Sequence, residues 1–475
     1  MRKTKLVITV GPASNNEESL REILKLADVI RINASHNSAD ERAVTLERIR
    51  RISEELGRKI PVFLDLQGPK WRLGMFQPSF NIAVGSIGAL YPVGDAAPQD
   101  SKLDWSAPLP HPELFQGARV GQTWLIDDGA LKLEVVDAKE RLVTLKVVIG
   151  GVLKERKGIH PIGLDVIFNP LTPKDLEDAK WGVEAGVDLF AQSFVRRASD
   201  VETLQEVIKS HGGSQPIIAK IEHPQALDNL DDIIKVTYGI MVARGDLGVE
   251  LGVEKVPALQ KMIIKKTRQA LKPVITATQM LESMIENASP TRAEASDVAN
   301  AIWDGTDGVM LSAESAAGKN PVAAVTYLHR IAENADDNFQ PRMGRLTDSL
   351  DSAITGRTDV SVAFAACRTA EEIGAKAVVV FTEGGGVARM VSRLSANVPV
   401  IAATTNPVVA RRMGLMRNVT SMLINRVESS DAMVASVEEQ LKGDFGIQAG
   451  DKVVMTLGLP LWKSGTTNTM KVVTY

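Results

Sequence analysis

The chain has 475 residues, of which 44% are hydrophobic, 24% are charged and only 4% are aromatic. This length exceeds one compact core and favours about three domains, and the few aromatic residues argue against stacking surfaces for single-stranded nucleic acid. A formal charge of -3 at pH 7 provides no basic field for nucleic acid or an anionic membrane, so we expect neither as a partner.

Eight short apolar runs, separated by amphipathic stretches, dominate the chain. They lie at residues 5–10, 29–33, 61–66, 189–194, 216–221, 239–244, 273–278 and 308–312. This alternation is typical of a parallel sheet wrapped by helices, and eight is the strand number of a TIM barrel. The predicted fold class is therefore α/β, with a (β/α)8 barrel. Capping signatures at Thr172, Ser199 and Thr291 indicate the starts of three helices.

More than a hundred residues separate the third run from the fourth, which is too long for an ordinary connection between a strand and a helix. Alternating segments at residues 131–136 and 142–148, with glycines between them, predict an inserted small β-barrel lid domain at residues 73–158. The barrel domain is then formed by residues 1–72 and 159–342.

The last part of the chain reads as a third domain. After a helix at residues 322–338, polar residues 340–352 resemble a linker. Strands at residues 375–382, 398–404 and 452–457, with helices between them, predict a C-terminal α/β domain at residues 343–475. We expect this domain to serve regulation or oligomerisation.

The single cysteine and the amino terminus bear on the compartment. Cys367 has no partner for an intrachain disulfide, which suits a reducing compartment. The basic amino terminus continues into a strand-like run without the apolar region of a signal peptide, and no apolar stretch reaches the length of a membrane span. We therefore expect a cytoplasmic protein.

Polar side chains close seven of the eight apolar runs. They are Arg31, Asn33, Ser35, Asp65, Ser193, Arg196, Lys220, Glu222, Arg244, Asp246, Thr278, Gln279, Ser312 and Glu314. Each alone has an ordinary explanation as a cap, a turn or a surface ion pair. Because the carboxyl ends of barrel strands meet at one mouth, their convergence favours a site.

The chemistry of this set indicates phosphoryl transfer on a small carboxylate. Arg31 and Lys220 offer cations for phosphate oxygens, and the carboxylates Glu222 and Asp246 suit Mg²⁺, for which Mn²⁺ could substitute. Gly245 lets backbone N–H groups approach an anion at the start of a helix. The sequence contains neither a P-loop nor a zinc-like spacing of histidines.

Several long motifs resemble the pyruvate kinase family. They are TVGPAS at 9–14, RINASH at 31–36, DLQGPK at 65–70, IDDG at 126–129, AKIE at 219–222, MVARGDLG at 241–248, TATQML at 276–281 and PTRAEASDVANA at 290–301. The match is dense from residue 2 to residue 325 and thinner towards the end. The resemblance implies a pyruvate kinase that transfers the phosphoryl group of phosphoenolpyruvate to ADP in glycolysis, giving pyruvate and ATP.

The resemblance also assigns roles to single residues. It implies that Arg31 and Lys220 contact the phosphoryl group in flight, and that Glu222 and Asp246 hold the divalent ion. The substrate-binding residues that it implies are Ser193, Ala243, Arg244, Gly245 and Thr278.

Proton transfer and nucleotide binding are assigned in the same way. The family protonates the enolate through a network of water and hydroxyl groups that here would include Thr278 and Ser312. The implied nucleotide-binding residues are Arg31, His36, Asp128 and Lys157. The resemblance further implies a homotetramer.

The third strand end differs from family members that require K⁺. Those members follow the aspartate with Thr-Lys and carry a glutamate three residues after that lysine, whereas this chain reads DLQGPK at 65–70. The monovalent-cation site or its surrogate comprises Asn33, Ser35, Asp65, Leu66 and Lys70. We predict activity without K⁺, because the Lys70 ammonium would supply the positive charge. The alternative is that Lys70 is solvated and K⁺ still binds.

Two further departures concern the lid and the third domain. His160, Pro161 and Ile162 stand where the family usually has Asn-Leu-Pro, so the segment expected to hinge the lid departs from the family pattern. The effector loop of regulated relatives is rich in Ser and Thr, whereas this chain has Glu383 in TEGGGV at 382–387, which would repel a phosphate. An anionic effector is left open by four arginines that could equally be solvated: Arg389, Arg393, Arg411 and Arg412.

Two other functions compete with this interpretation. A catalytically silent relative could sense metabolites or scaffold partners, although the presence of Lys220, Glu222 and Asp246 speaks against it. A barrel aldolase or lyase could also form a pyruvate enolate with a metal. Lys157 in the inserted domain favours a nucleotide partner instead.

Overall fold

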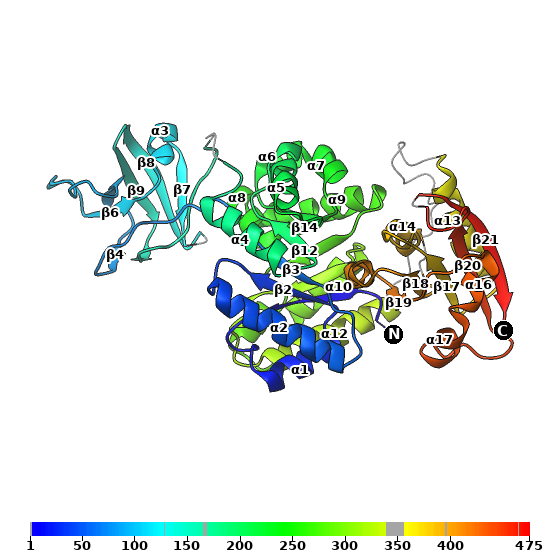
Figure 1. Ribbon diagram of the computed structural model, residues 1–475. Coiled ribbons are helices and arrows are strands. Elements are labelled where there is room, and N and C mark those ends of the chain that lie inside the picture. The colour runs from blue at the N-terminus through cyan, green and yellow to red at the C-terminus, as the bar shows by residue number, and fades with distance from the viewer. Residues whose placement is uncertain (1, 128, 165–168, 339–355, 395–396, 464) are drawn as a thin grey trace.

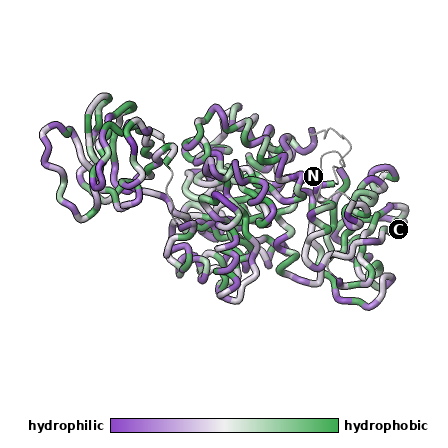
Figure 2. The backbone as a smooth tube through the Cα atoms, turned by 90° about the horizontal axis from the view of Figure 1, so that it is seen from above, coloured by the Kyte–Doolittle hydropathy of each residue, from purple (hydrophilic) through white to green (hydrophobic). Residues whose placement is uncertain are grey.

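The computed structural model describes residues 2–127, 129–164, 169–338, 356–394, 397–463 and 465–475. Three units lie in a row, with an inserted β-rich unit at one end, a barrel in the middle and a C-terminal unit at the other end (Figure 1). Figure 2 shows the same row from above. The amino terminus lies between the barrel and the C-terminal unit, where the N–H of Asn418 donates to the carbonyl of Lys3 over 2.9 Å.

Eight parallel strands close into the predicted barrel. They are β1 (Lys5–Val10), β2 (Val29–Asn33), β3 (Val62–Asp65), β12 (Leu189–Gln192), β13 (Ile217–Ile221), β14 (Gly239–Ala243), β15 (Val274–Ala277) and β16 (Gly308–Leu311). They follow one another around the barrel in chain order, and β16 pairs with β1. Each predicted apolar run contains one of these strands, so the predicted TIM barrel is confirmed.

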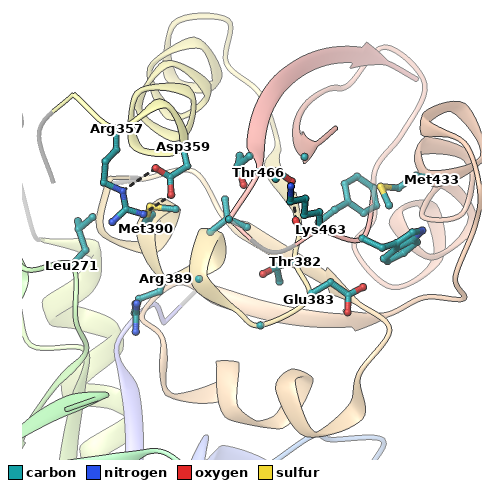
Figure 3. Close-up of a pocket in the computed structure, with 18 of the residues that line it drawn as sticks. Leu271, Arg357, Asp359, Thr382, Glu383, Arg389, Met390, Met433, Lys463 and Thr466 are labelled. Atoms are coloured by element: carbon teal, nitrogen blue, oxygen red, sulfur yellow. Dashed lines mark hydrogen bonds and ion pairs between the residues drawn. The ribbon is translucent and has the colours of Figure 1, made fainter. Parts of the chain in front are cut away.

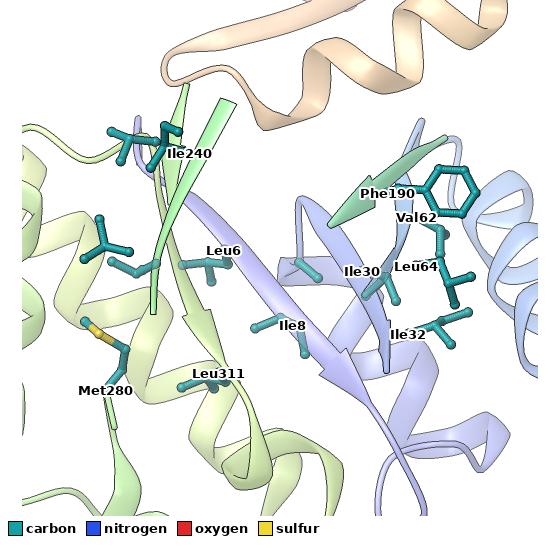
Figure 4. Packing of buried hydrophobic residues seen from close by; sticks show 14 of the residues in the cluster. Leu6, Ile8, Ile30, Ile32, Val62, Leu64, Phe190, Ile240, Met280 and Leu311 are labelled. Atoms are coloured by element: carbon teal, nitrogen blue, oxygen red, sulfur yellow. The ribbon is translucent and has the colours of Figure 1, made fainter. Parts of the chain in front are cut away.

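Both faces of the barrel strands are buried. Leu6, Ile8 and Ile30 pack outward against the surrounding helices (Figure 4). Val7 and Phe63 belong to a second cluster that fills the barrel interior. Burial on both faces explains why these strands read as continuous apolar runs, which leaves polar residues to the strand ends.

Helices cover the outside of the barrel. They include α1 (Glu17–Leu26), α2 (Ala39–Glu55), α4 (Pro173–Glu184), α5 (Ala198–Ser210), α6 (Pro224–Asp228), α7 (Leu230–Val236), α8 (Arg244–Leu251), α9 (Val256–Gln269), α10 (Arg292–Trp303), α11 (Ala313–Ala316) and α12 (Pro321–Asp337). Thr172 and Thr291 form capping boxes at the starts of α4 and α10, as predicted. The cap predicted at Ser199 is wrong, because α5 begins two residues earlier than that cap implies, at Ala198 with Arg197 as its N-cap. The Asp200 carboxylate accepts the N–H of Arg197 there and satisfies the helix start.

The inserted unit is built on a sheet. Its elements are β4 (Phe80–Ile82), β5 (Ile87–Pro92), β6 (Trp105–Leu109), α3 (Pro112–Gly117), β7 (Thr123–Ile126), β8 (Leu131–Lys139), β9 (Leu142–Ile149), β10 (Gly151–Leu153) and β11 (Ile159–Pro161). The main sheet has six strands in the order β11-β7-β8-β9-β5-β6, and β4 pairs with β10.

The closed β-barrel predicted for this unit is not formed by the described strand pairs. Residues 93–104 connect β5 to β6 and let them pair in parallel, while the other pairs are antiparallel. This leaves β6 and β11 as the edges of an open sheet. The pairing of β11 with β7 extends the sheet as far as Pro161.

The C-terminal unit is the predicted α/β domain. Its elements are α13 (Thr358–Glu372), β17 (Ala377–Phe381), α14 (Gly386–Leu394), β18 (Val400–Thr404), α15 (Pro407–Arg412), η4 (Met413–Leu415), β19 (Val419–Leu423), α16 (Ser430–Ala435), α17 (Glu438–Gly443), β20 (Lys452–Gly458) and β21 (Thr467–Thr474). The sheet order is β19-β18-β17-β20-β21, with only β21 antiparallel to its neighbour.

The three strands predicted in this unit are confirmed as β17, β18 and β20, whereas β19 and β21 were missed. Both missed strands are largely polar or exposed, so they lack a continuous apolar run. The linker predicted at 340–352 lies outside the described residues. Within the described residues, no helix combines the length and the apolar character that crossing a membrane requires.

Candidate active site at the barrel mouth

The carboxyl ends of the barrel strands bring most of the predicted polar residues together. We call the central group the mouth cluster. It consists of Arg31, Asp65, Ser193, Lys220, Glu222 and Asp246. These residues come from the ends of five different strands or from the residues directly after them. The mouth cluster therefore depends on closure of the barrel.

Lys220, on β13, lies at the centre of the mouth cluster. Its Nζ is 2.7 Å from Ser193 Oγ, 2.9 Å from Glu222 Oε1 and 3.3 Å from Asp65 Oδ1. Burial disfavours the ammonium, but the carboxylates of Asp65 and Glu222 outweigh burial and raise the pKa of Lys220 above its ordinary value. Lys220 is thus a firmly charged cation at the mouth.

Asp65 holds a second cation beside Lys220. Arg31 Nε donates to Asp65 Oδ2 over 2.7 Å, and the same Arg31 side chain donates to Thr9 Oγ1 over 3.1 Å. Asp65 is 1% exposed, so its charge offsets the repulsion that two neighbouring cations would otherwise feel. Arg31 and Lys220 therefore form a pair of cations that can face the same anion.

Thr9 was missed in the sequence because β1 was the one strand end given no polar role. It pairs in register with Arg31 on β2, and its hydroxyl donates to the carbonyl of Leu311 over 2.7 Å. The missed signal was the position of Thr9 near the end of a barrel strand. Thr9 orients the Arg31 guanidinium.

The carboxylates of Glu222 and Asp246 lie close enough for the charge of one to affect the pKa of the other. Burial raises the pKa of Glu222, Lys220 opposes this rise, and the charge of Asp246 adds to it. Burial would also raise the pKa of Asp246, but Lys70 and Lys220 bring it below its ordinary value. Glu222 is 1% exposed and accepts the N–H of Phe194 over 2.8 Å. Two partly shielded carboxylates of this kind fit a hard divalent cation.

A site with two carboxylates agrees with the preferences of Mg²⁺. Among the described residues, no three His, Cys, Asp or Glu side chains are grouped as a metal site. Mg²⁺ does not need such a cage, because it keeps several water molecules and takes one or two carboxylates together with substrate oxygens. Glu222 and Asp246 therefore fit this ion as its protein ligands.

The helix α8 begins directly after β14, at the predicted carboxylate-binding segment. The N–H of Gly245 donates to Thr278 Oγ1 over 2.7 Å. A Cβ atom added at Gly245 would lie 3.5 Å from the same Oγ1, which is an ordinary contact. Packing inside the chain therefore does not require glycine at this position, which leaves close approach of a ligand as the explanation offered by the sequence.

The Arg244 side chain is fully occupied by the protein. Its NH1 lies 2.7 Å from Asp297 Oδ2, on α10, while its Nε and NH2 donate to the carbonyl of Thr278 over 3.2 and 2.7 Å. Arg244 therefore holds α10 and the loop after β15 in place. The role in substrate binding that was predicted for Arg244 can therefore fall only to its backbone, at the start of α8.

Thr278 has a strained backbone. Its φ is +69°, and that of Gln279 is +52°, although a β-branched residue such as threonine rarely adopts positive φ. The contacts from Arg244 hold both carbonyls of this turn. The strained turn keeps Thr278 Oγ1 against the start of α8.

Glu314 connects the loops that carry Thr278 and Ser312. Its Oε2 accepts the N–H of Ser312 over 2.7 Å, and its Oε1 accepts the N–H of Leu281 over 3.2 Å. Glu314 is 1% exposed. The sequence identified it at a strand end but assigned it no role, and its function in the structure is to position these two loops.

The residues predicted for the monovalent-cation site make separate contacts in the structure. Asn33 Oδ1 accepts the N–H of Ser35 over 3.0 Å, and the carbonyl of Leu66 accepts the hydroxyl of Ser193 over 2.7 Å. Lys70 Nζ lies 3.4 Å from Asp246 Oδ1. The structure thus places the Lys70 ammonium beside a predicted metal ligand.

The residues predicted to bind the nucleotide do not lie together in one group. Lys157 Nζ lies 2.7 Å from Asp127 Oδ1, inside the inserted unit. His36 is exposed after β2, and Asp128 lies outside the described residues. Arg31 alone of this set belongs to the mouth cluster.

The C-terminal unit contains a cavity of about 200 Å³ next to the TEGGGV loop at 382–387 (Figure 3). Thr382, Glu383 and Arg389 line it, and Arg357 pairs with Asp359 at its edge over 2.6 Å. Of the four arginines left open for an anionic effector, only Arg389 lines this cavity.

The other three arginines do not line this cavity. Arg393 pairs with Asp307, Arg411 Nε lies 2.8 Å from Asp188 Oδ1, and Arg412 Nε donates to the carbonyl of Asp188 over 3.0 Å. These three arginines therefore join the C-terminal unit to the barrel, with the Arg393 side chain buried and Arg411 and Arg412 half-buried.

Comparisons with known proteins agree with this architecture. The family profile described as "Pyruvate kinase, barrel domain" matches residues 1–325, and "Pyruvate kinase, alpha/beta domain" matches residues 360–473. The chain is 40% identical to a pyruvate kinase of Bacillus licheniformis, over 99% of this chain and 80% of the relative. It is 39% identical to one of Agrobacterium vitis, over 99% of this chain and 98% of the relative.

A solved structure supports the same conclusion. A crystal structure of a pyruvate kinase from Cryptosporidium parvum superposes with a TM-score of 0.91 at 31% identity, covering 100% of this chain and 96% of the other. Family profiles, relatives along nearly the full length and the solved fold agree with one another. The chain belongs to the pyruvate kinase family of phosphotransferases.

Proposed function

We propose that this chain transfers the phosphoryl group of phosphoenolpyruvate to ADP, giving pyruvate and ATP in glycolysis, with Mg²⁺ or Mn²⁺ and without a K⁺ requirement. The observation that carries the proposal is the contact of Lys220 with Asp65, Ser193 and Glu222 at one barrel mouth. Family membership supports the reaction class.

Arg31 and Lys220 bind the phosphoryl group in this proposal. Both cations are held by the buried Asp65, so they are already oriented before an anion arrives. Phosphoryl transfer depends on positioning and on neutralising charge, which preorganised cations supply without reorganisation.

Glu222 and Asp246 are the proposed ligands of the divalent ion. When bound, Mg²⁺ would neutralise negative charge on the substrate oxygens. The two carboxylates would otherwise repel each other, which is consistent with the effect of Asp246 on the pKa of Glu222. Lys70, 3.4 Å from Asp246, adds a fixed positive charge next to this pair.

Backbone groups of Ala243, Arg244 and Gly245 are proposed to receive the substrate carboxylate at the start of α8, beside Ser193. After the phosphoryl group leaves, the enolate takes a proton on carbon. Thr278 and Ser312 are the hydroxyls proposed for the network that delivers it. The strained turn at Thr278 supports this role, because strain is concentrated at functional sites.

The fixed charge of Lys70 is the basis for proposing independence from K⁺. The Lys70 ammonium, 3.4 Å from Asp246 Oδ1, supplies a positive charge beside a proposed metal ligand, and we propose that this charge replaces the one that a monovalent cation would supply. The proposed surrogate site contains Asn33, Ser35, Asp65, Leu66 and Lys70.

The proposal extends to partners. Lys157 and Asp128 of the inserted unit, with Arg31 and His36, would meet the phosphates of ADP when this unit acts as a lid. A homotetramer and a cytoplasmic location are expected from the family. An anionic effector of the C-terminal unit would have to bind away from Glu383, because this carboxylate lines the cavity and would repel an anion there.

The test is to follow pyruvate formation from phosphoenolpyruvate and ADP with Mg²⁺ in a potassium-free tetramethylammonium buffer, and then to add K⁺. Turnover that K⁺ changes little supports both the kinase and the role of Lys70. Activity that appears only after K⁺ addition contradicts the role of Lys70, and silence in both buffers contradicts the kinase.

A further inference from the structure

Two chain segments connect the inserted unit to the barrel, and they are hydrogen-bonded to each other. Arg72 forms an antiparallel bridge with Gly158. The N–H of Leu73 donates to the carbonyl of Lys157 over 2.9 Å, and the N–H of Ile159 donates to that of Trp71 over 3.0 Å. The two connecting segments are therefore paired where they leave the inserted unit.

Both connecting segments also contact the helix α8. Lys70, two residues before Arg72, lies 3.4 Å from Asp246 Oδ1. His160, two residues after Gly158, places its Nδ1 3.5 Å from Glu250 Oε1. Asp246 and Glu250 are four residues apart on α8 and so share one face of that helix. Each of the two connecting segments therefore makes one side-chain contact with the short helix α8.

The contact of His160 with Glu250 is well shielded from water. The side chain of His160 is 4% exposed and that of Glu250 is 9% exposed. Within the described part of the chain, His160 is the one basic side chain within 4.0 Å of the Glu250 carboxylate, and the contact is an ion pair when the imidazole is protonated. A shielded carboxylate is costly without such a partner, so this contact constrains how the inserted unit sits on α8.

The position of α8 gives this contact a functional meaning. The first turn of α8 carries Asp246 and the backbone groups proposed to receive the substrate carboxylate. His160 belongs to β11, the edge strand that pairs with β7. The turn directly after β7 carries Asp127, the partner of Lys157. His160 therefore lies between the proposed metal site and the proposed nucleotide-binding end of the inserted unit.

We propose that His160 and Glu250 are positioning residues that fix the inserted unit against α8, so that its nucleotide-binding residues stay aligned with Asp246. The inference rests on the proposed function, because alignment with a nucleotide matters only if ADP is a substrate. The Lys70–Asp246 contact is the second attachment, and it anchors the other connecting segment. Neither His160 nor Glu250 touches the reacting atoms in this role.

The first arm of the test is a double-mutant cycle with His160→Ala, Glu250→Ala and the double variant. We expect each single variant to raise the KM for ADP about threefold to tenfold, while the KM for phosphoenolpyruvate changes much less. The double variant should be no worse than the single variants, because each removes the same contact. His160→Asn, whose amide can still donate towards Glu250, should restore most of the loss.

The matched control is His329→Gln on α12. His329 also stands near a glutamate, with Nε2 3.9 Å from Glu333 Oε2, and its Nδ1 accepts a hydrogen bond from Arg2 Nε over 3.1 Å, at the amino terminus of the chain. We expect this variant to leave the KM values for both substrates unchanged. Thermal unfolding of every variant separates loss of positioning from loss of folding.

The second arm does not require activity. Hydrogen–deuterium exchange should be faster for backbone amides at residues 157–160 in Glu250→Ala than in the wild type, because the connecting segment loses its attachment. Additive effects in the cycle, equal increases in both KM values, or unchanged exchange would each overturn the positioning role. Absence of turnover in the wild type would instead contradict the proposed function, and the exchange measurement would still test the attachment.

Discussion

Buried ion pairs occur at both ends of the barrel, but they differ in what satisfies the carboxylates. At the amino-terminal ends of the strands lies a group that we call the floor cluster. It consists of Asp188, Asp307 and Asp336 with Arg393, Arg411 and Arg417. The mouth cluster lies at the carboxyl-terminal ends of the same barrel.

Backbone groups saturate the aspartates of the floor cluster. Asp336 Oδ2 accepts the N–H groups of Lys3 and Thr4, each over 2.7 Å. Asp307 accepts the N–H of Val274 over 2.7 Å in addition to its pairing with Arg393. Carboxylates satisfied in this way have little capacity left for a ligand, so this cluster joins two domains.

Side-chain cations dominate the mouth cluster instead. Asp65 and Glu222 share Lys220, and Asp246 faces Lys70 across 3.4 Å. A substrate anion or a divalent ion can take over such contacts without breaking the backbone ladder. The buried carboxylates of the mouth are therefore matched mainly by preorganised side-chain cations that a ligand can also contact, whereas those of the floor are also saturated by backbone N–H groups.

The largest expected effect is on folding stability at the floor. Asp307→Asn leaves Arg393 buried without its charged partner, so we expect a loss of about 3–5 kcal/mol in the free energy of unfolding. Activity per folded molecule should change little. Chemical denaturation measures the loss. As the control, Asp231→Asn breaks the exposed pair with Lys266 and should cost less than about 1 kcal/mol. Equal losses in the two variants would contradict the distinction.

The second prediction concerns the mouth. Lys220→Met removes the central cation, and we expect kcat to fall by about 10²- to 10³-fold, because a preorganised charge that stabilises the transition state is lost. Steady-state kinetics with phosphoenolpyruvate and ADP measure this effect. Circular dichroism should show that the variant still folds. A reduction of less than about tenfold would remove Lys220 from the proposed chemistry.

A smaller effect is expected at Arg244, which resembles the floor arginines because the protein occupies its guanidinium. Arg244→Lys cannot reproduce the forked contact with Asp297 and Thr278, so we expect kcat to fall by about tenfold through displacement of the Thr278 turn. The control is Arg368→Lys in an exposed pair with Glu372, which should change nothing. Unchanged kinetics in Arg244→Lys would show that the turn holds its position without the fork.

The smallest expected effect is a pH dependence of stability near the floor. Burial, assisted by Arg389, lowers the pKa of Lys272 from 10.5 to about 8. Between these values the unfolded chain binds more protons than the folded chain, so Lys272 contributes a rise in stability as pH increases from about 8 towards 10.5. Below pH 8 the full cost of the buried charge is present.

This contribution is measured as a difference between proteins. The unfolding free energy of the wild type should rise relative to that of Lys272→Met across this pH interval. Parallel pH profiles for the two proteins would show that Lys272 titrates normally in the folded state.

The sequence predicted the barrel and the mouth because both follow from local patterns. Strands buried on both faces are apolar along their length, so residues such as Arg31, Lys220 and Glu222 stand out where the runs end. Thr9 escaped because its hydroxyl differs little from any strand-end threonine. The role of Glu314 escaped because its partners are backbone N–H groups of two separate loops, which no spacing in the chain reveals.

The floor could not be predicted in the same way. The sequence left Arg393 and Arg411 as effector ligands or solvated residues, and the structure pairs them with aspartates that lie 86 and 223 positions away along the chain. The closed barrel expected for the inserted unit failed for a related reason, because the pairing of its edge strands depends on how a long connection is placed.

By itself, the sequence determined the strand number of the barrel, the residues at its mouth and the family. These features are repeated locally, with one apolar run and one polar end for each strand. Only the tertiary structure decided which charges are saturated, how β11 and His160 meet α8, and what the C-terminal arginines contact. Those outcomes depend on two surfaces meeting at close range, and the shape and charge of such a contact come from residues far apart in the chain.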